Sequence, residues 1–248
     1  MLKTENIEME NQILLVQNIC KSFEKKQALC DVSFSLKKGS FTVIAGPNGS
    51  GKSVLMSLIA GLDEPDSGKI VSKPAGLVFQ DADAQILGET PLEDISFSLR
   101  NLGLSKKERK IEAEKALAEM SLLEKKNLPS RSLSGGEKRR LAVAGILALK
   151  RDFFIFDEPF ANLDFPGVSQ VCNILKKLKS EGKTVIVLTH ELEKILALAD
   201  NFIILSKGKI VFNGTAGDGL SKNLEDFGIK NPFQKYTEIQ DLFWGSKE

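Results

Sequence analysis

The sequence has few features that would place its 248 residues in a specialised class of protein. Its three cysteines, Cys20, Cys30 and Cys172, are far apart and show no metal-binding or redox spacing, so we expect reduced thiols. The 34 lysines and arginines nearly cancel the 33 aspartates and glutamates, which leaves a net charge of +1. This balance gives no support to nucleic acid as the main partner.

Long apolar segments are also missing. The longest apolar run, residues 141–149, is interrupted by Gly145 and is too short to cross a bilayer. Residues 1–6 lack the basic start and the long apolar stretch of a signal peptide. We therefore expect the chain to be cytosolic.

The most informative stretch is residues 46–53, which fit the pattern G-x-x-x-x-G-K-[ST] of a phosphate-binding loop. An apolar run before it predicts a buried strand, and residues 54–60 after it predict a helix. This order directs backbone N–H groups and a helix N-terminus at an anion. The loop residues expected to bind a nucleotide are Gly46, Asn48, Gly49, Ser50, Gly51, Lys52 and Ser53.

Two side chains of this loop have separate predicted roles. Lys52 would place its charge on the β- and γ-phosphates, and Ser53 would give its hydroxyl to Mg²⁺. We expect the Lys52 ammonium to be exposed, so that its loss removes phosphate binding and not core packing. The alternative is an ordinary glycine-rich turn before a capped helix, which the flanking strand and helix disfavour.

The sequence before and after this loop predicts two further kinds of structure. Residues 13–19 and 28–36 predict strands that are joined by a polar turn, hence an antiparallel unit. Residues 81–134 contain helix-start signals at Thr90 and Ser105 but no strand pattern. We therefore expect a helical insertion of about fifty residues.

Apolar runs return later in the chain, at residues 153–156, 184–188 and 202–205. They are apolar throughout, as strands covered on both faces are, and helical segments separate them. The sequence thus predicts an α/β fold: a parallel-sheet P-loop NTPase core with an antiparallel β subdomain and an inserted α-helical subdomain.

Two carboxylates, Asp157 and Glu158, follow the first of these runs. Ligands of open α/β sheets bind at the carboxyl ends of strands, and buried carboxylates need a partner there. Mg²⁺ with a nucleotide meets that need: Asp157 would hold the metal through water, and Glu158 would activate or orient the attacking water. The alternative is that Glu158 only caps the next helix.

The sequence has one histidine, His190. It ends the run of residues 184–189 and is expected at the same sheet edge as Asp157. A lone histidine is often a hydrogen-bonded structural residue, but this position favours a contact with the γ-phosphate.

A second glycine-bearing anion candidate is the stretch LSGGE, residues 133–137, with Ser134, Gly135 and Gly136 at its centre. Alone it is a common turn from a loop into a helix. Its value lies in its combination with the other motifs.

That combination resembles the ATP-binding-cassette ATPases over roughly residues 13–220. The motifs that carry the resemblance come in the family's order: the phosphate-binding loop, Gln80, LSGGE, FFIFDEP (residues 153–159), Ala161-Asn162-Leu163-Asp164 and Thr189-His190.

The resemblance implies how these residues share the nucleotide between two ATPase subunits. It assigns Phe23, which otherwise fits simple hydrophobic packing, to adenine stacking, and Gln80 to the metal and the attacking water. It assigns Ser134 with Gly136 to the γ-phosphate of the other subunit's site. Asp164 belongs to the loop that links the two sites.

A narrower resemblance points to the energy-coupling factor ATPases, which power the uptake of vitamins and of cobalt or nickel ions. It rests on three stretches, GLVFQDADAQ (residues 76–85), NLGL (101–104) and EKRRLAVAG (137–145). It implies a second ATPase, identical or a sister subunit, a transmembrane coupling protein and a substrate-binding membrane protein. The chain would then lie at the cytoplasmic face of the membrane as a peripheral subunit.

The resemblance also sets the expected domain boundaries. We expect an ATPase domain over residues 1–220, with the helical subdomain at 81–135 and a short tail at 221–248. The sequence departs from the family pattern at Asp81-Ala82, where asparagine and proline are usual, and at Asn162, where glycine is common. Neither departure removes a catalytic group.

The segment of residues 81–102 is expected to contact the membrane partner, since it joins Gln80 to the helical insertion. Apolar side chains that could line a groove for a partner helix are Ile86, Leu87, Ile95 and Phe97, and the alternative is that they pack inside the insertion.

Three other functions share part of this motif set. The ATPase of a different transporter would have the same catalytic residues. A soluble ABC ATPase of the iron–sulfur assembly type also fits a single cassette without long coiled-coil insertions. A nucleotide-binding module without turnover is disfavoured by the joint presence of Gln80, Glu158 and His190.

Overall fold

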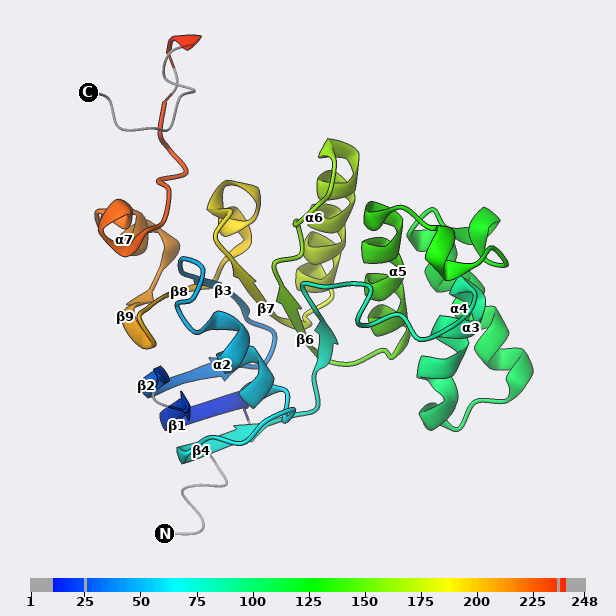
Figure 1. The fold of residues 1–248 in the computed structure, drawn as a ribbon, viewed down its shortest axis with the longest axis horizontal. Coiled ribbons are helices and arrows are strands. Elements are labelled where there is room, and N and C mark those ends of the chain that lie inside the picture. Colours follow the sequence, from blue (N-terminus) through cyan, green and yellow to red (C-terminus); the bar gives the residue numbers. More distant parts are fainter. Residues whose placement is uncertain (1–10, 25, 236, 240–248) are drawn as a thin grey trace.

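A three-stranded sheet, a six-stranded sheet and a group of helices lie side by side in this protein (Figure 1). The structure is a computed structural model that describes residues 11–24, 26–235 and 237–239. None of the helices in these residues is long and apolar enough to span a membrane.

The smaller sheet has the strand order β2-β1-β4, and both of its pairs are antiparallel. Its strands are β1 (Gln12–Phe23), β2 (Lys26–Lys37) and β4 (Ser67–Ser72). The predicted antiparallel unit is therefore confirmed. A tight connection between β1 and β2 leaves Phe23 at the end of the sheet, half exposed.

The larger sheet has the strand order β5-β6-β7-β3-β8-β9, and only β9 runs antiparallel to its neighbour. The sequence predicted the parallel strands but not β9. A two-residue turn at Lys207 and Gly208, with φ of 48° and 76°, folds β9 back onto β8. The strands are β3 (Phe41–Ala45), β5 (Gly76–Val78), β6 (Phe153–Asp157), β7 (Thr184–Thr189), β8 (Asn201–Ser206) and β9 (Lys209–Gly214).

Two helices lie within the segment predicted to be a helical insertion, α3 (Pro91–Ser98) and α4 (Lys106–Glu119). Helix α5 (Gly135–Ala148) begins where that segment ends and packs against both of them (Figure 1). Thr90 caps α3 and Ser105 opens α4 with a capping box, as their sequence signals predicted. Ile95 is fully buried in this subdomain. The expectation that it lines a groove for a partner is therefore wrong, whereas Leu87 and Phe97 are exposed.

The other helices are α2 (Lys52–Ile59), α6 (Phe165–Ser180) and the short α7 (Ala216–Leu220). Brief 3₁₀ turns connect the elements, at Leu99–Leu102, Leu123–Lys125, Ser130–Ser132, Leu192–Lys194, Leu196–Leu198 and Leu224–Phe227. Leu224 and Ile229 are buried in the main core, so the first part of the segment after residue 220 packs against the rest of the fold.

Two apolar clusters cover the two faces of the larger sheet. On β6, Phe154 and Phe156 face one cluster, which includes side chains of α5 and α6. Phe153 and Ile155 face the other cluster, which includes side chains of the smaller sheet and α2. Successive side chains of a strand point to opposite faces, which explains why β6 is apolar at consecutive positions. This double cover holds the carboxyl ends of the strands in fixed positions.

We predict that Phe156→Ala lowers the free energy of unfolding by about 3–5 kcal/mol, because the cavity it leaves lies inside the sheet core. Phe165→Ala is the control, since the Phe165 side chain is 86% exposed and its loss changes stability by only about 0.5 kcal/mol. Denaturant unfolding followed by circular dichroism measures both. Equal effects of the two substitutions would contradict the assigned core.

Candidate nucleotide-binding and hydrolysis site

The glycine-rich loop connects β3 to α2, as predicted. Gly51 is the N-cap of α2 with φ of 106° and no side-chain hydrogen bond, so the first N–H groups of the helix point outward without an internal partner. A Cβ on Gly51 would lie 2.7 Å from the carbonyl oxygen of Ala28, and one on Gly46 would lie 2.2 Å from that of Leu205. Only glycine fits at these two positions, and the resulting helix N-terminus favours an anion.

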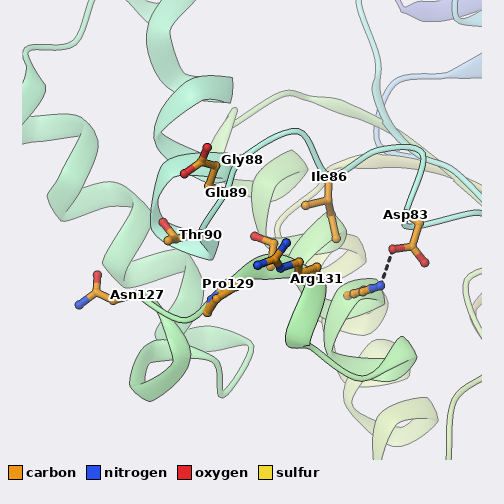
Figure 2. Close-up of a pocket in the computed structure, with 10 residues that line it drawn as sticks. Asp83, Ile86, Gly88, Glu89, Thr90, Asn127, Pro129 and Arg131 are labelled. Carbon is orange, nitrogen blue, oxygen red and sulfur yellow. Dashed lines mark hydrogen bonds and ion pairs between the residues drawn. The ribbon is translucent and has the colours of Figure 1, made fainter.

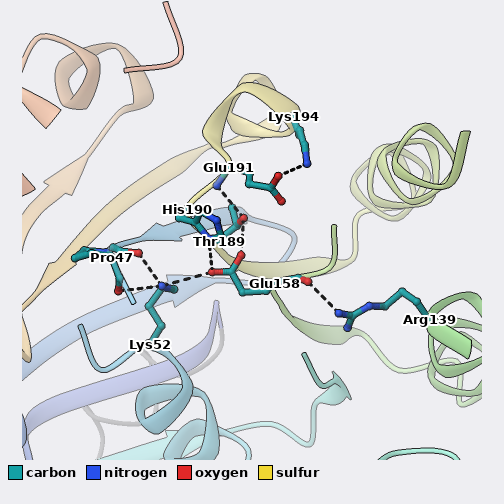
Figure 3. Close-up of polar contacts among 9 residues, drawn as sticks. Pro47, Lys52, Arg139, Glu158, Thr189, His190, Glu191 and Lys194 are labelled. Carbon is teal, nitrogen blue, oxygen red and sulfur yellow. Dashed lines mark hydrogen bonds and ion pairs between the residues drawn. The ribbon is translucent and has the colours of Figure 1, made fainter. Parts of the chain in front are cut away.

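Lys52 is buried, with only 6% of its surface exposed. Its Nζ donates to the carbonyl oxygen of Gly46 at 2.7 Å and lies 3.5 Å from Glu158 Oε1 (Figure 3). The expectation of an exposed ammonium is therefore wrong. The loop curls over the lysine, and the opposing carboxylate balances its charge.

Glu158 follows β6 and is also buried, at 5% exposure. Thr189 Oγ1 donates to its Oε2 at 3.0 Å, and His190 Nδ1 lies 2.9 Å from its Oε1 (Figure 3). The next helix, α6, begins at Phe165 and is capped by Asp164. The alternative that Glu158 only caps that helix is therefore wrong.

The backbone of Glu158 is as constrained as its side chain. Its φ of 45° lies in the left-handed region, which a glutamate rarely adopts. Its N–H donates to the carbonyl oxygen of Leu188 at 2.8 Å, which fastens it to the end of β7. This conformation aims the carboxylate at Lys52 and His190.

Asp157, the last residue of β6, is 3% exposed. Burial raises the pKa of its carboxyl above the ordinary value, and the neighbouring Glu158 adds to this, while Ser53, Lys52 and Arg139 act in the opposite direction. Its Oδ1 is buried and has no hydrogen-bond partner among the residues that the structure describes. An acceptor in this state is suited to a ligand that brings positive charge or donors.

A cavity of about 730 Å³ lies beside the loop. It brings together predicted residues from distant parts of the chain: Phe23, Asn48, Gly49, Gly51, Lys52, Ser53, Gln80 and Glu158. Its wall also contains Lys26, Lys207 and Gly208, which no sequence motif marked as site residues. Gly208 N–H donates to the Ser50 carbonyl at 2.9 Å, so the turn between β8 and β9 holds the loop in place.

The second group of predicted residues lies elsewhere. Ser134 is exposed as the N-cap of α5 and forms a capping box with Glu137, and Asp164 accepts from Gly167 N–H at 3.0 Å. Ser134, Gly135, Gly136 and Asp164 are all absent from the wall of the cavity beside Lys52. Within one chain, the candidate residues therefore form two separate groups.

Arg139 is a buried charge to which the sequence analysis gave no role. Its guanidinium donates to the backbone carbonyls of Phe79, Gln80 and Glu158, with Nη2 at 2.6 Å from Gln80 O and 3.3 Å from Glu158 O. The available signal was helical spacing, because Arg139 shares a face of α5 with the buried Ala142 and Val143.

A strand, a glycine-rich loop and a helix at the carboxyl edge of a parallel sheet define a P-loop NTPase. Residues 29–161 match the family described as ABC transporter. A cobalt import ATP-binding protein, CbiO, of Rhodobacter capsulatus is 36% identical over 83% of this chain and 80% of the relative. An energy-coupling factor transporter ATP-binding protein, EcfA1, of Fusobacterium nucleatum is 37% identical over 82% of each chain.

Solved structures agree with this likeness. The structure of cbiO1 from Clostridium perfringens, part of the ABC transporter complex cbiONQ, is 30% identical, with a TM-score of 0.75 over 86% of this chain and 92% of that one. A dimeric post-hydrolysis state of the ATP-binding cassette MJ0796 with ADP and Pi is 28% identical, with a TM-score of 0.76 over 82% of this chain and 98% of that one. The chain therefore belongs to the ATP-binding subunits of the ABC transporter family, and it is an ATPase subunit of that family. The predicted family and fold class are confirmed.

We predict that Glu158→Gln binds ATP with unchanged affinity but hydrolyses it at least about 10²-fold more slowly, because the amide keeps the shape and loses the charge that polarises water. Steady-state ATPase assays and binding of a fluorescent ATP analogue measure the two effects. Glu191→Gln is the control, since that carboxylate pairs with Lys194 and not with Lys52. Hydrolysis by Glu158→Gln at the parental rate would show that Glu158 is not the catalytic carboxylate.

Proposed function

We propose that this chain is the ATP-hydrolysing subunit of an importer of the energy-coupling factor type, which takes up vitamins or transition-metal ions. The observation that carries the ATPase part is the buried Glu158 carboxylate, which Lys52, Thr189 and His190 all contact. The importer type is supported by relatives named for cobalt import and for energy-coupling factor transport.

In this proposal the cavity beside the loop holds ATP. The half-exposed Phe23 ring stacks on adenine, and the N–H groups of the loop with Lys52 hold the phosphates. Glu158 accepts a proton from the attacking water or orients it, and His190 contacts the γ-phosphate. Gln80 lies in the cavity wall, where its side chain contacts the attacking water.

Mg²⁺ fits the same site. The unpaired Oδ1 of Asp157, the hydroxyl of Ser53 and the side chain of Gln80 are oxygen donors of the kind that this ion takes together with nucleotide phosphates. When bound, the ion would neutralise charge on the phosphates. The residues of this chain would hold it through Ser53 and Gln80, and through Asp157 by way of water.

The proposal includes a second ATPase subunit. The candidate residues of this chain that lie outside the cavity complete the site of that subunit, and its equivalent residues complete the site of this chain. Ser134 and Gly135 are exposed at the N-terminus of α5, where N–H groups can meet the γ-phosphate of another subunit, with Gly136 beside them. Asp164 lies on the loop between the two sites. The related MJ0796 cassette is a dimer in its solved structures, which supports this arrangement.

Mixing two inactive variants tests this arrangement and the ATPase proposal together. Lys52→Ala keeps the Ser134 loop intact, and Ser134→Arg keeps Lys52. We predict that activity rises on mixing to at most about a quarter of the parental rate. Half of the randomly formed dimers are then heterodimers with one complete site, and coupling between the two sites would lower the rate further. ATPase assays over a range of mixing ratios measure the recovery.

Two controls make this result decisive. The parental chain alone must hydrolyse ATP at a specific rate that rises with protein concentration, which shows that it pairs with itself. Differently tagged variants must co-purify, which shows that heterodimers form. If both hold and mixing restores nothing, the assignment of Ser134 to the other subunit's site is wrong.

The transmembrane partner is proposed to dock beside the segment after Gln80. A cavity of about 500 Å³ lies there, with Asp83, Ile86 and Arg131 in its wall (Figure 2). Asp83 pairs with Lys138 of α5 at 2.5 Å. Leu87, exposed at 74%, follows directly and belongs to a neighbouring groove with Phe97. A coupling helix with apolar and charged side chains would suit this surface.

We predict that Leu87→Glu weakens docking of the membrane partner by about tenfold or more. A leucine side chain that becomes buried on docking contributes about 1.5–3 kcal/mol to the binding free energy, and glutamate loses this contribution. ATP hydrolysis by the isolated subunit should stay unchanged. Leu62→Glu is the control, since Leu62 is 59% exposed after α2 and far along the chain from this segment. Co-purification and transport in reconstituted vesicles measure the effect, and equal losses for both variants would contradict the docking site.

The proposal also places the chain at the cytoplasmic face of a membrane as a peripheral subunit. Its ATPase unit spans residues 1–220, with the helical subdomain at 81–135 and the tail at 221–248. Support for the unit comes from the relatives, which match more than four fifths of this chain.

A further inference from the structure

Helix α5 contains two adjacent arginines with different surroundings. Arg140 Nε donates to the Met120 carbonyl at 3.2 Å, inside the helical subdomain. Arg139 is only 3% exposed and points out of that subdomain toward the larger sheet. A buried guanidinium requires several acceptors to offset the loss of its hydration, so its partners identify what it holds.

The partners of Arg139 are backbone carbonyls at two neighbouring strand ends. Phe79 and Gln80 follow β5, and Glu158 follows β6, which pairs with β5. Its Nη2 alone bridges the two strand ends, at 2.6 Å from Gln80 O and 3.3 Å from Glu158 O. A planar fork with several fixed donors can do this, whereas the compact ammonium of lysine has no such fork.

The contact with Glu158 supports a strained residue. The φ of 45° places Glu158 in the left-handed region, and such a conformation persists only where the surroundings hold it on several sides. The Leu188 carbonyl accepts from the N–H of Glu158. The Arg139 guanidinium donates to the Glu158 carbonyl (Figure 3). Loss of the second contact would let the peptide rotate and move the carboxylate away from Lys52 and His190.

The positive charge of Arg139 also stabilises its position next to Glu158. Burial lowers the pKa of Arg139, but the acidic side chains of Asp157, Asp81 and Glu158 oppose this effect. Arginine remains protonated in proteins, so a fixed positive charge lies behind the two carboxylates of the hydrolysis site. It reduces the repulsion between Asp157 and Glu158 without entering the cavity.

We propose that Arg139 is a positioning residue for ATP hydrolysis, which fixes the backbones of Gln80 and Glu158 relative to α5, the helix that Ser134 caps. This inference rests on the proposed ATPase function. A shift of α5 would therefore move both Gln80 and Glu158. The hydrogen bonds of Arg139 go to these segments and not to the phosphate-binding loop, so the loop would still bind ATP. Lys138, the preceding residue, pairs with Asp83 at the proposed docking surface, so one helix reaches from that surface to the hydrolysis site.

The test is Arg139→Lys, which keeps the charge and loses the fork, with Arg140→Lys as the matched control. We expect kcat of Arg139→Lys to fall by about 10²-fold, the size of effect that a small misplacement of a catalytic group produces. KM and the affinity for a fluorescent ATP analogue should stay within about threefold, since the loop is intact. Arg140→Lys should leave kcat and KM unchanged.

A double variant separates positioning from a general structural role. If Arg139 acts through Glu158, adding Arg139→Lys to Glu158→Gln should lower the residual rate by far less than 10²-fold, because the carboxylate is already lost. The same fold-loss in both backgrounds would overturn the proposal. So would a fall in ATP affinity that matches the fall in kcat, or unfolding of Arg139→Lys in circular dichroism, which would make the residue structural. Failure of the ATPase function itself is distinguishable, since the parental chain would then neither bind nor hydrolyse ATP.

Discussion

The structure of the site depends on one buried charge balance, between the Glu158 carboxylate and the Lys52 ammonium at 3.5 Å. Each group is almost fully covered, and an isolated charge in such a place would be costly. The hydroxyl of Thr189 and the ring of His190 supply further contacts to the same carboxylate. Removal of either charge leaves the other uncompensated, so the loop and the end of β6 are coupled in stability as well as in chemistry.

The topology of the larger sheet brings these two charges together. The order β6-β7-β3 places the end of β7 between the other two strand ends, with Asp157 beside Leu188 and Ala45 beside Thr189. Three segments far apart in the sequence thereby deliver Lys52, Glu158 and His190 to one edge. The two apolar clusters fix the strands from both faces, so the geometry of this edge follows from core packing and not from the loops alone.

Local patterns explain what the sequence could predict. The glycine loop, the capping box at Ser105 and the apolar strands depend on neighbours within a few residues, and each is present in the structure. Three features depend on distant partners and were missed or wrong: the burial of Lys52 under its own loop, strand β9 beside β8, and the grip of Arg139 on two strand ends. Sequence spacing shows which face Arg139 occupies but not which carbonyls lie opposite.

Helix α5 links the exposed candidate residues at its N-terminus to the buried candidate residues in the cavity beside the loop. At its N-terminus, Glu137 and Ser134 satisfy each other's backbone N–H groups, which leaves those of Gly135 and Gly136 directed outward. One turn later, Arg139 holds the backbone carbonyls of Gln80 and Glu158 at the candidate hydrolysis site of the same chain. A phosphate that binds the N-terminus of α5 would favour one position of this helix. Arg139 would transmit that position to Glu158. Coupling between two sites requires an element that both of them bias, and α5 has the contacts for this role.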